Sequence, residues 1–152
     1  MDMERQSYMA LALDSAATAK RRDEVPVGAV VVHAPSQRVV GRAGNQMRDR
    51  NDPSAHAEIL ALRAAGTALG TARLDQCDLY VTLEPCTMCA GAISLARIRR
   101  LYFGALDPKA GAVENGVRFF QQPSCHHAPE VYGGIDADRA GDLLRDYFQK
   151  KR

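Results

Sequence analysis

Two short segments of the chain carry residue types that could bind and use a metal ion. His56 and Glu58 are separated by one residue, and Cys86 and Cys89 follow Pro85 in the pattern Pro-Cys-x-x-Cys. Cysteines three positions apart lie on the same face of a helix, so both thiols can point at one ion. The N-terminus of a helix also stabilises thiolates, because its free N–H groups and its dipole favour negative charge.

Two thiolates and one imidazole form a ligand set that suits Zn²⁺. With His56, Cys86 and Cys89 as protein ligands, a four-coordinate ion keeps one position open for water. Zinc lowers the pKa of such a water to roughly 7, and a carboxylate beside it could carry the proton. Glu58 is the candidate. Because residues two apart on a helix face different ways, His56 and Glu58 converge only beyond the helix end or from different sides.

Other functions are compatible with parts of this pattern. A Cys-x-x-Cys between a strand and a helix is also the arrangement of thioredoxin-like redox sites. A closed structural zinc site, in a module that binds RNA without chemistry, is a further alternative; its fourth ligand would be Cys77, Cys125, His126 or His127. Outside such a site, we expect the two cysteines to be buried free thiols and the two histidines to form loop or core hydrogen bonds.

The elements that must position these residues alternate along the chain. Alternating strands and helices predict an α/β domain in three α/β/α layers, with a mixed sheet covered by helices on both faces. The first two strands are expected to form an antiparallel hairpin, and residues 107–134 a long loop. Asp52 is a plausible N-cap, with Pro53 at the first helical position. The expected helices are 4–21, 53–66, 85–97 and 136–151, and the expected strands are 27–32, 38–41, 79–83 and 101–104.

Composition is that of an ordinary globular protein with one domain, residues 1–152. Hydrophobic residues make up 46% and charged residues 25%, and the net charge of +2 is too small to indicate nucleic-acid binding by itself. No stretch approaches the ~18 apolar residues of a membrane span. The N-terminus carries acidic residues and lacks the apolar core of a secretory signal, so we expect a cytoplasmic protein.

The joint pattern of His-x-Glu followed by Pro-Cys-x-x-Cys, with Cys86 30 positions after His56, is the signature of zinc nucleobase deaminases. Nearly the whole chain resembles one family of them, the bacterial tRNA-specific adenosine deaminases of the cytidine-deaminase-like superfamily. The longer similar runs favour this family over deaminases of cytosine, guanine or free nucleotides. The resemblance is carried by residues 24–30, 51–59, 79–92 and 102–105 and by Phe148.

The resemblance implies a fold, a cofactor and a reaction. The family fold has a central mixed five-stranded sheet between helices, and the family enzyme is a homodimer. The resemblance implies that His56, Cys86 and Cys89 bind Zn²⁺ and that Glu58 shuttles protons. The implied reaction is the hydrolytic deamination of adenosine to inosine at the wobble position of tRNA. Deamination of a free guanine or cytosine base or nucleoside is the enzymatic alternative.

The resemblance also implies a substrate site. Asn45 matches the asparagine of the family that contacts the target nucleoside, and Pro26 and Val27 match part of the wall around the base. Asp107 and Lys109 lie where the family contacts the anticodon loop. The chain departs from the best-known members after residue 111, where residues 113–116 replace a small Gly-Ser pair.

Several basic residues could follow the phosphates of an RNA. Residues 150–152 form a basic C-terminus, which could equally be a solvated end. Arg97, Arg99 and Arg100 are the other candidates, and pairing with acidic residues or with a partner subunit is the alternative for them.

Overall fold

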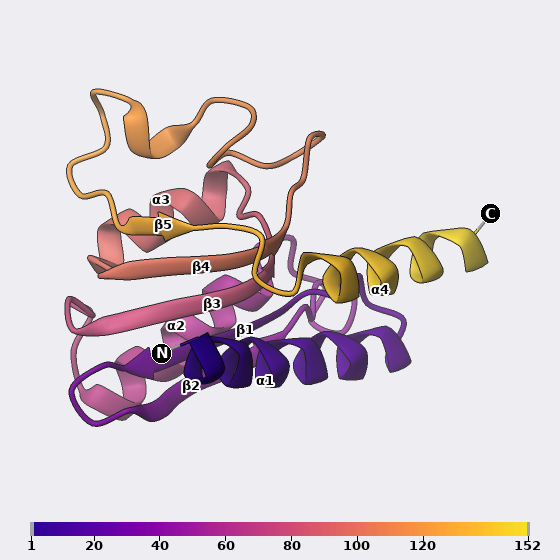
Figure 1. Ribbon diagram of the computed structural model, residues 1–152, viewed down its shortest axis with the longest axis horizontal. Coiled ribbons are helices and arrows are strands. Elements are labelled where there is room, and N and C mark those ends of the chain that lie inside the picture. Colours follow the sequence, from indigo (N-terminus) through magenta and orange to yellow (C-terminus); the bar gives the residue numbers. More distant parts are fainter. Residues whose placement is uncertain (1, 152) are drawn as a thin grey trace.

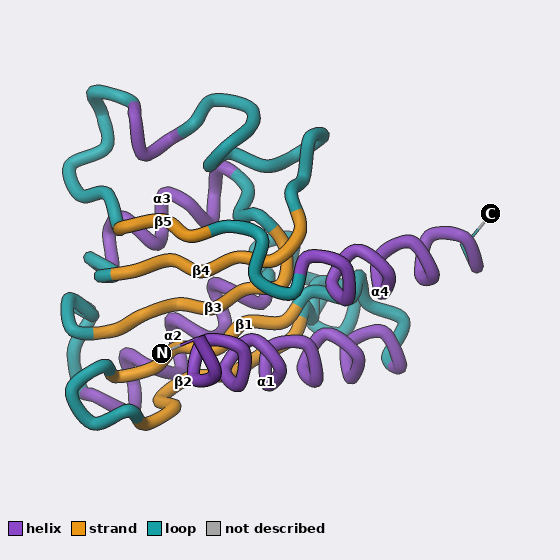
Figure 2. Tube along the Cα trace, in the orientation of Figure 1, coloured by secondary structure: helices purple, strands orange, loops and turns teal. Residues whose placement is uncertain are grey.

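The chain folds into alternating strands and helices (Figure 2). The computed structural model describes residues 2–151, with the side chains of residues 7–151. The strands are β1 (Gly28–His33), β2 (Arg38–Gly44), β3 (Cys77–Leu83), β4 (Arg100–Ala105) and β5 (Glu130–Tyr132). The helices are α1 (Asp2–Arg21), α2 (Ala57–Leu69), α3 (Thr87–Ala96) and α4 (Ala137–Lys150), with a 3₁₀ turn at Phe119–Gln121.

The five strands form one mixed sheet in the order β2-β1-β3-β4-β5. β1 is antiparallel to both β2 and β3, whereas β3, β4 and β5 run parallel. Helices α1 and α4 lie on one face of the sheet and α2 and α3 on the other (Figure 1). The predicted three-layer architecture is therefore confirmed. No helix in the described part of the chain is both long and apolar enough to cross a membrane.

The core forms on both faces of the sheet because successive side chains of a strand point to opposite sides. In β1, Ala29 and Val31 pack into the cluster that includes α2 and Ile93 of α3, while Val30 and Val32 pack into the cluster under α1. Burial on both faces accounts for the uninterrupted apolar sequence of this strand.

Helix α1 lies unusually close to β1 because Gly28 has no side chain. A Cβ atom at Gly28 would lie 1.9 Å from the carbonyl oxygen of Ala12, in the middle of α1. Gly41 of β2 serves α2 in the same way, since its Cβ would lie 2.2 Å from the carbonyl oxygen of Ala61. These two glycines let helices pack against the hairpin backbone on both faces.

A row of tyrosine rings crosses the α1/α4 face of the sheet. Tyr80 and Tyr102 stack with ring centroids 4.5 Å apart, and Tyr102 and Tyr132 stack at 5.1 Å. The rings come from adjacent positions in the register of β3, β4 and β5. Tyr8 of α1 joins the row through a tilted contact with Tyr80 at 5.3 Å. This row ties β5, which has only three residues, to the centre of the sheet.

Several predicted boundaries are wrong by two to four residues. Strand β2 ends at residue 44 rather than 41, and β3 begins at residue 77 rather than 79. Helix α2 begins at Ala57 rather than at Pro53, because Asp52 accepts hydrogen bonds from Ser54 and forms a turn instead of a helix cap. Helix α2 also ends at Leu69, three residues past the predicted end at Gly66, and Gly70 follows as a left-handed C-cap. Helix α3 begins at Thr87, two residues later than predicted.

The predicted loop at 107–134 contains two short regular elements. The 3₁₀ turn and β5 both lie within it. Three residues are too few to show a strand periodicity in the sequence, and β5 is defined by its parallel pairing with β4. This pairing supplies the fifth strand that the family resemblance implied.

Candidate metal and substrate site

The predicted site residues collect at one edge of the sheet. The parallel strands β3 and β4 both end there, with Leu83 paired with Ala105. The antiparallel strand β1 begins at the same edge and β2 ends there, with Gly28 paired with Gly44. We call this end of the strands the site edge. The segments that enter or leave the sheet there carry Pro26, Val27, Asn45, Cys86, Asp107 and Lys109.

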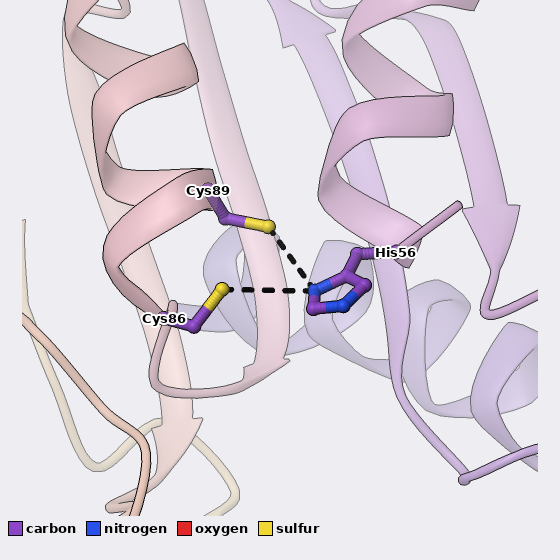
Figure 3. A group of neighbouring side chains, drawn as sticks. All are labelled: His56, Cys86 and Cys89. Carbon is purple, nitrogen blue, oxygen red and sulfur yellow. Dashed lines mark hydrogen bonds between the residues drawn. The ribbon is translucent and has the colours of Figure 1, made fainter. Parts of the chain in front are cut away.

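The three candidate ligands converge on one point (Figure 3). The Nδ1 atom of His56 lies 3.4 Å from Sγ of Cys89 and 3.7 Å from Sγ of Cys86. The three ligand atoms all lie within 4.8 Å of one another. His56 comes from the start of α2, and the two cysteines come from the start of α3, so two helix N-termini face the same point.

The start of α2 separates the roles of His56 and Glu58. His56 is the N-cap residue in an extended conformation, with φ −74° and ψ 151°, so its side chain lies beyond the helix end. Glu58 is in the first turn and is 4% exposed. The two side chains therefore reach the site from different positions, which resolves the conflict that helical spacing alone would create.

The charges of these groups are coupled. Hydrogen bonds from Cys89, and then from His56, lower the pKa of the Cys86 thiol to about 4 against the cost of burial. The contact with Cys86 raises the pKa of Cys89, and burial adds to this rise. The hydrogen bond to Cys86 raises the pKa of His56. Burial raises the pKa of the Glu58 carboxyl. These shifts favour the thiolate form of Cys86, which is the form that coordinates a metal cation.

The donor set fits zinc with an open fourth position. Two thiols and one imidazole nitrogen are typical zinc ligands, and three protein ligands leave one position for a reactant. His56, Cys86 and Cys89 are the one group among the described residues that could hold a metal ion with three or more histidine, cysteine or carboxylate ligands.

The other cysteines and histidines lie elsewhere. Cys77 is a buried free thiol, as predicted, and Cys125 is a free thiol that is only partly buried. Cys125 contacts the hydroxyl of Ser94 at 3.5 Å and donates to the carbonyl of His127 at 3.1 Å. The His127 ring bonds the carbonyl of Ile98 at 2.7 Å, as expected for a loop histidine. His126 is exposed, and none of these four residues joins His56, Cys86 and Cys89 in the ligand group found among the described residues, which argues against a closed structural zinc site.

Asn45 joins the segment of Pro26 and Val27 to the helix that carries Glu58. Its side-chain oxygen accepts a hydrogen bond of 2.8 Å from the N–H of Ala57, the first residue of α2. Its own backbone N–H donates to the carbonyl of Val27 at 3.1 Å. Val27 and Pro26 are both buried. The structure thus brings Val27, Asn45 and the start of α2 together.

Asp107 and Lys109 begin the loop that follows β4. The Asp107 carboxylate accepts hydrogen bonds from the N–H groups of Lys109 and Ala110, at 3.2 and 3.0 Å. The side chain of Asp107 is partly buried and that of Lys109 is exposed. Asp107 therefore shapes this turn, and Lys109 is the member of the pair that presents a charge to solvent.

Two buried glutamates outside the predicted site residues hold the loops around the site. Glu24 is 2% exposed and accepts hydrogen bonds from the N–H groups of Arg48 and Asp49, at 3.1 and 2.8 Å. Glu84 is also 2% exposed and accepts five hydrogen bonds from residues 107–115. A lone glutamate next to a turn gives no signal in the sequence, because its donors lie far along the chain.

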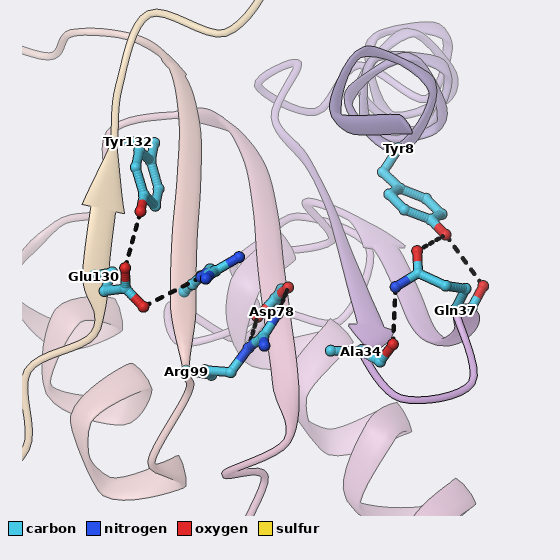
Figure 4. A network of polar contacts seen from close by, with 8 residues as sticks. Tyr8, Ala34, Gln37, Asp78, Arg99, Glu130 and Tyr132 are labelled. Carbon is cyan, nitrogen blue, oxygen red and sulfur yellow. Dashed lines mark hydrogen bonds and ion pairs between the residues drawn. The ribbon is translucent and has the colours of Figure 1, made fainter. Parts of the chain in front are cut away.

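Most of the basic candidates form ion pairs within the chain. Arg99 donates two hydrogen bonds to Asp78, at 2.9 and 2.7 Å, at the edge opposite the site (Figure 4). Arg100 pairs with Glu130 at 3.2 Å. The expectation that these arginines pair with acidic residues is thus confirmed. Arg97 is the left-handed C-cap of α3.

The basic C-terminus is held against the body of the protein. Lys151 pairs with Asp23 and lies over the ring of Tyr147, 5.5 Å from its centroid. Lys150 lies 3.6 Å from Asp146. Arg152 lies outside the described residues.

Comparison with known proteins assigns this site to a class. The family described as the cytidine and deoxycytidylate deaminase zinc-binding region matches residues 2–105. This match includes all three candidate ligands and Glu58. The fold and the site therefore define a zinc-binding deaminase domain, which excludes the thioredoxin-like alternative.

The relatives give a narrower assignment. A tRNA-specific adenosine deaminase of Agrobacterium fabrum (strain C58) is 60% identical over 149 residues, which cover 98% of this chain and 97% of the relative. One of Rickettsia typhi is 42% identical over 144 residues, covering 95% and 97%. The chain belongs to the tRNA-specific adenosine deaminase family.

Solved structures agree with this assignment. A structure from studies of A-to-I editing by tRNA:A34 deaminases at the wobble position matches with a TM-score of 0.88 and 60% identity, covering 91% of this chain and 99% of the other. A guanine deaminase from Nitrosomonas europaea matches with a TM-score of 0.77 and 26% identity, covering 93% and 83%.

Proposed function

We propose that the chain is one domain, residues 1–152, that deaminates adenosine to inosine at the wobble position of tRNA. The observation that carries this proposal is the convergence of His56, Cys86 and Cys89 beside the buried carboxyl of Glu58. The relatives that share most of the chain are named for tRNA adenosine, whereas the guanine deaminase is only 26% identical. A tRNA-modifying enzyme of this kind acts in the cytoplasm.

Zinc is the proposed cofactor, held by His56, Cys86 and Cys89. When bound, zinc supplies the Lewis acidity that makes water a nucleophile at neutral pH. The lowered pKa of Cys86 supplies one of the thiolates that coordination needs.

Glu58 is the proposed proton carrier. Its carboxyl is buried beside His56 and Cys89, and burial raises its pKa. A raised pKa makes the carboxylate a better base and its acid form a competent donor near neutral pH. The oxygen of water bonds to C6 of adenine as N1 gains a proton, and the bond between C6 and the exocyclic nitrogen breaks in the step that follows. Glu58 takes protons from the water and delivers them to the ring nitrogen N1 and to the departing amine, so that ammonia leaves and inosine remains.

The proposed substrate site lies along the site edge. The target base must leave any stack to reach a recessed carboxylate, which costs least in a single-stranded loop such as an anticodon. Pro26 and Val27 form one wall for the base, and Asn45 contacts the nucleoside. Asp107 shapes the turn from which Lys109 contacts the anticodon loop.

We also propose a homodimer, as the family resemblance implies. An apolar groove between α2 and α3 offers the surface; Leu62, Ala92 and Leu95 are in its lining, and Leu95 is 84% exposed. Light scattering of the protein and of Leu95→Glu tests this. A dimer that the substitution converts to a monomer supports the proposal, and a monomeric wild-type protein contradicts it.

A substrate panel tests the function. Purified protein is incubated with an anticodon stem-loop and separately with guanine, cytosine and adenosine, and ammonia release is measured. We expect release from the stem-loop alone, and a rate that falls as salt rises, because phosphate contacts depend on counterion release. Release from a free base at a rate indifferent to salt would favour the small-molecule alternative.

A further inference from the structure

We propose that Glu84 is a positioning residue for RNA binding: its buried carboxylate holds the loop of residues 107–115 against the metal ligand Cys86. The inference deepens the proposed function and rests on it, because this loop carries Asp107 and Lys109. Glu84 itself touches neither the substrate nor the metal site.

The carboxylate of Glu84 gathers five donors from one segment. Its Oε1 atom accepts from the N–H of Asp107 at 2.9 Å and from the side-chain amide of Asn115 at 2.7 Å. Its Oε2 atom accepts from the N–H groups of Val113, Glu114 and Asn115, at 3.0, 2.8 and 3.0 Å. Both ends of the loop thus bond to a single side chain, which closes the loop around it.

The loop is also joined directly to the ligand segment. Gly111 forms an isolated antiparallel bridge with Cys86, and the N–H of Ala112 donates to the carbonyl of Pro85 at 2.9 Å. The fit is tight, because a Cβ atom at Gly111 would lie 2.4 Å from the Cδ atom of Glu84. The short segment 84–86 therefore contains both the groups that bind the loop and the candidate metal ligand Cys86.

A carboxylate is required for this arrangement. Five N–H donors fill the acceptor positions of two carboxylate oxygens, and a glutamine side chain would turn an NH₂ group toward either two or three of them. The donors at Oε2 are three backbone N–H groups, and those at Oε1 include the N–H of Asp107, so either orientation deprives at least one recessed backbone group of its partner, which is costly. Glu84→Gln is thus nearly isosteric but cannot hold the loop closed.

The role follows from what the loop presents. Lys109 is exposed on the turn that begins at Asp107, and the backbone of that turn is tethered to Oε1 of Glu84. Release of the tether moves the charge that meets the RNA while leaving His56, Cys86 and Cys89 in place. The expected loss is therefore in RNA affinity rather than in zinc binding.

The first measurement does not depend on the proposed function. Hydrogen–deuterium exchange is compared for the wild-type protein, Glu84→Gln and Asp78→Asn. Asp78 is a matched control: it is a buried carboxylate, 7% exposed, at the opposite end of β3 and paired with Arg99. We expect faster exchange at residues 107–115 in Glu84→Gln only. Unchanged exchange in this segment overturns the inference.

The second measurement separates positioning from a structural role. Affinity for the anticodon stem-loop is measured by fluorescence anisotropy in a Glu58→Gln background, where turnover is expected to be slower by about 10²–10⁴-fold, and zinc content is measured on the same samples. We expect Glu84→Gln to weaken binding about tenfold or more with zinc retained, and KM rather than kcat to change in the active enzyme. Unchanged affinity, or loss of zinc with an unchanged KM, overturns the inference.

Asn115→Ala keeps the test decisive if Glu84→Gln does not fold. It removes one of the five donors, so we expect a smaller loss of affinity, of a few fold by the usual size of a single hydrogen bond, about 1 kcal/mol. No loss in this variant overturns the inference. If the wild-type protein neither binds nor deaminates the stem-loop, the proposed function is overturned, and with it the RNA role of Glu84. The hydrogen–deuterium exchange at residues 107–115 still tests whether Glu84 holds this loop.

Discussion

The side-chain oxygen of Asn45 lies 2.8 Å from the backbone nitrogen of Ala57 and accepts its hydrogen bond. A residue proposed to contact the nucleoside thus also caps the helix that carries Glu58. Helix α2 gets no side-chain cap from its own N-cap residue, His56, which is free to face the metal position. The cap comes instead from Asn45, 12 positions before Ala57.

The double role of Asn45 can be separated by two substitutions. Asn45→Ala removes the acceptor, so we expect a loss of about 1–2 kcal/mol in the free energy of unfolding together with a loss of activity. Asn45→Asp keeps an oxygen acceptor at the helix N-terminus and removes the amide donor. We expect its stability in urea to remain near wild type while deamination stays low. Equal stability of all three proteins would show that Asn45 is no cap.

Zinc content is expected to be independent of the remaining cysteines. Cys77 is buried in β3, and Cys125 bonds Ser94 and His127, so neither reaches the metal position. The double variant Cys77→Ala/Cys125→Ala should retain about one zinc per chain, whereas Cys86→Ala should lose it. Metal analysis of purified protein measures this. Loss of zinc in the double variant would instead support a closed structural zinc site with a fourth cysteine ligand.

Two glycines in different surroundings should respond in opposite ways to substitution by alanine. Gly28→Ala places a Cβ atom 1.9 Å from the carbonyl of Ala12, so we expect a loss of at least about 3 kcal/mol in the free energy of unfolding. Gly91 lies inside α3 with nothing within 4 Å of its added Cβ. Gly91→Ala should stabilise the protein by about 0.5–1 kcal/mol. Urea unfolding measures both, and a tolerated Gly28→Ala would contradict the packing.

Stability in acid should depend on Glu84. Burial would raise its pKa, but the hydrogen bonds from Asp107, Asn115 and Val113 outweigh burial and hold the pKa below its ordinary value of 4.5. A lowered pKa in the folded protein means that ionised Glu84 stabilises the fold above pH 4.5 and that this contribution is lost as pH falls through the lowered value.

The matching measurement compares unfolding of wild type and Glu84→Gln across this range. The stability difference between them should be constant from neutral pH to above pH 4.5 and should shrink in more acid solution. A difference that grows as pH falls would mean that the carboxyl is protonated in the folded protein.

The sequence predicts the metal site well because its information is local. Cys86 and Cys89 are held together by one turn of α3, and the joint pattern with His56 names the chemistry. The layers are also predictable, since β1 holds a continuous apolar run, β3 has the apolar centre Leu79-Tyr80-Val81, and α4 has a clear apolar face.

Features that depend on distant partners could not be predicted. The start of α2 is set by Asn45 rather than by Asp52, which bonds Ser54 instead. The acceptor role of Glu84 depends on donors 23 to 31 positions later. Such contacts have no periodicity or motif, and only the assembled fold reveals them.

The measurement that tests the central claim most directly is nucleoside mass spectrometry of an anticodon stem-loop after incubation with the wild-type protein and with Glu58→Gln, each carrying zinc. We expect inosine at the wobble position with the wild-type protein and a rate lower by about 10²–10⁴-fold with Glu58→Gln. Absence of inosine with the zinc-loaded wild-type protein, or full activity of Glu58→Gln, would contradict the account.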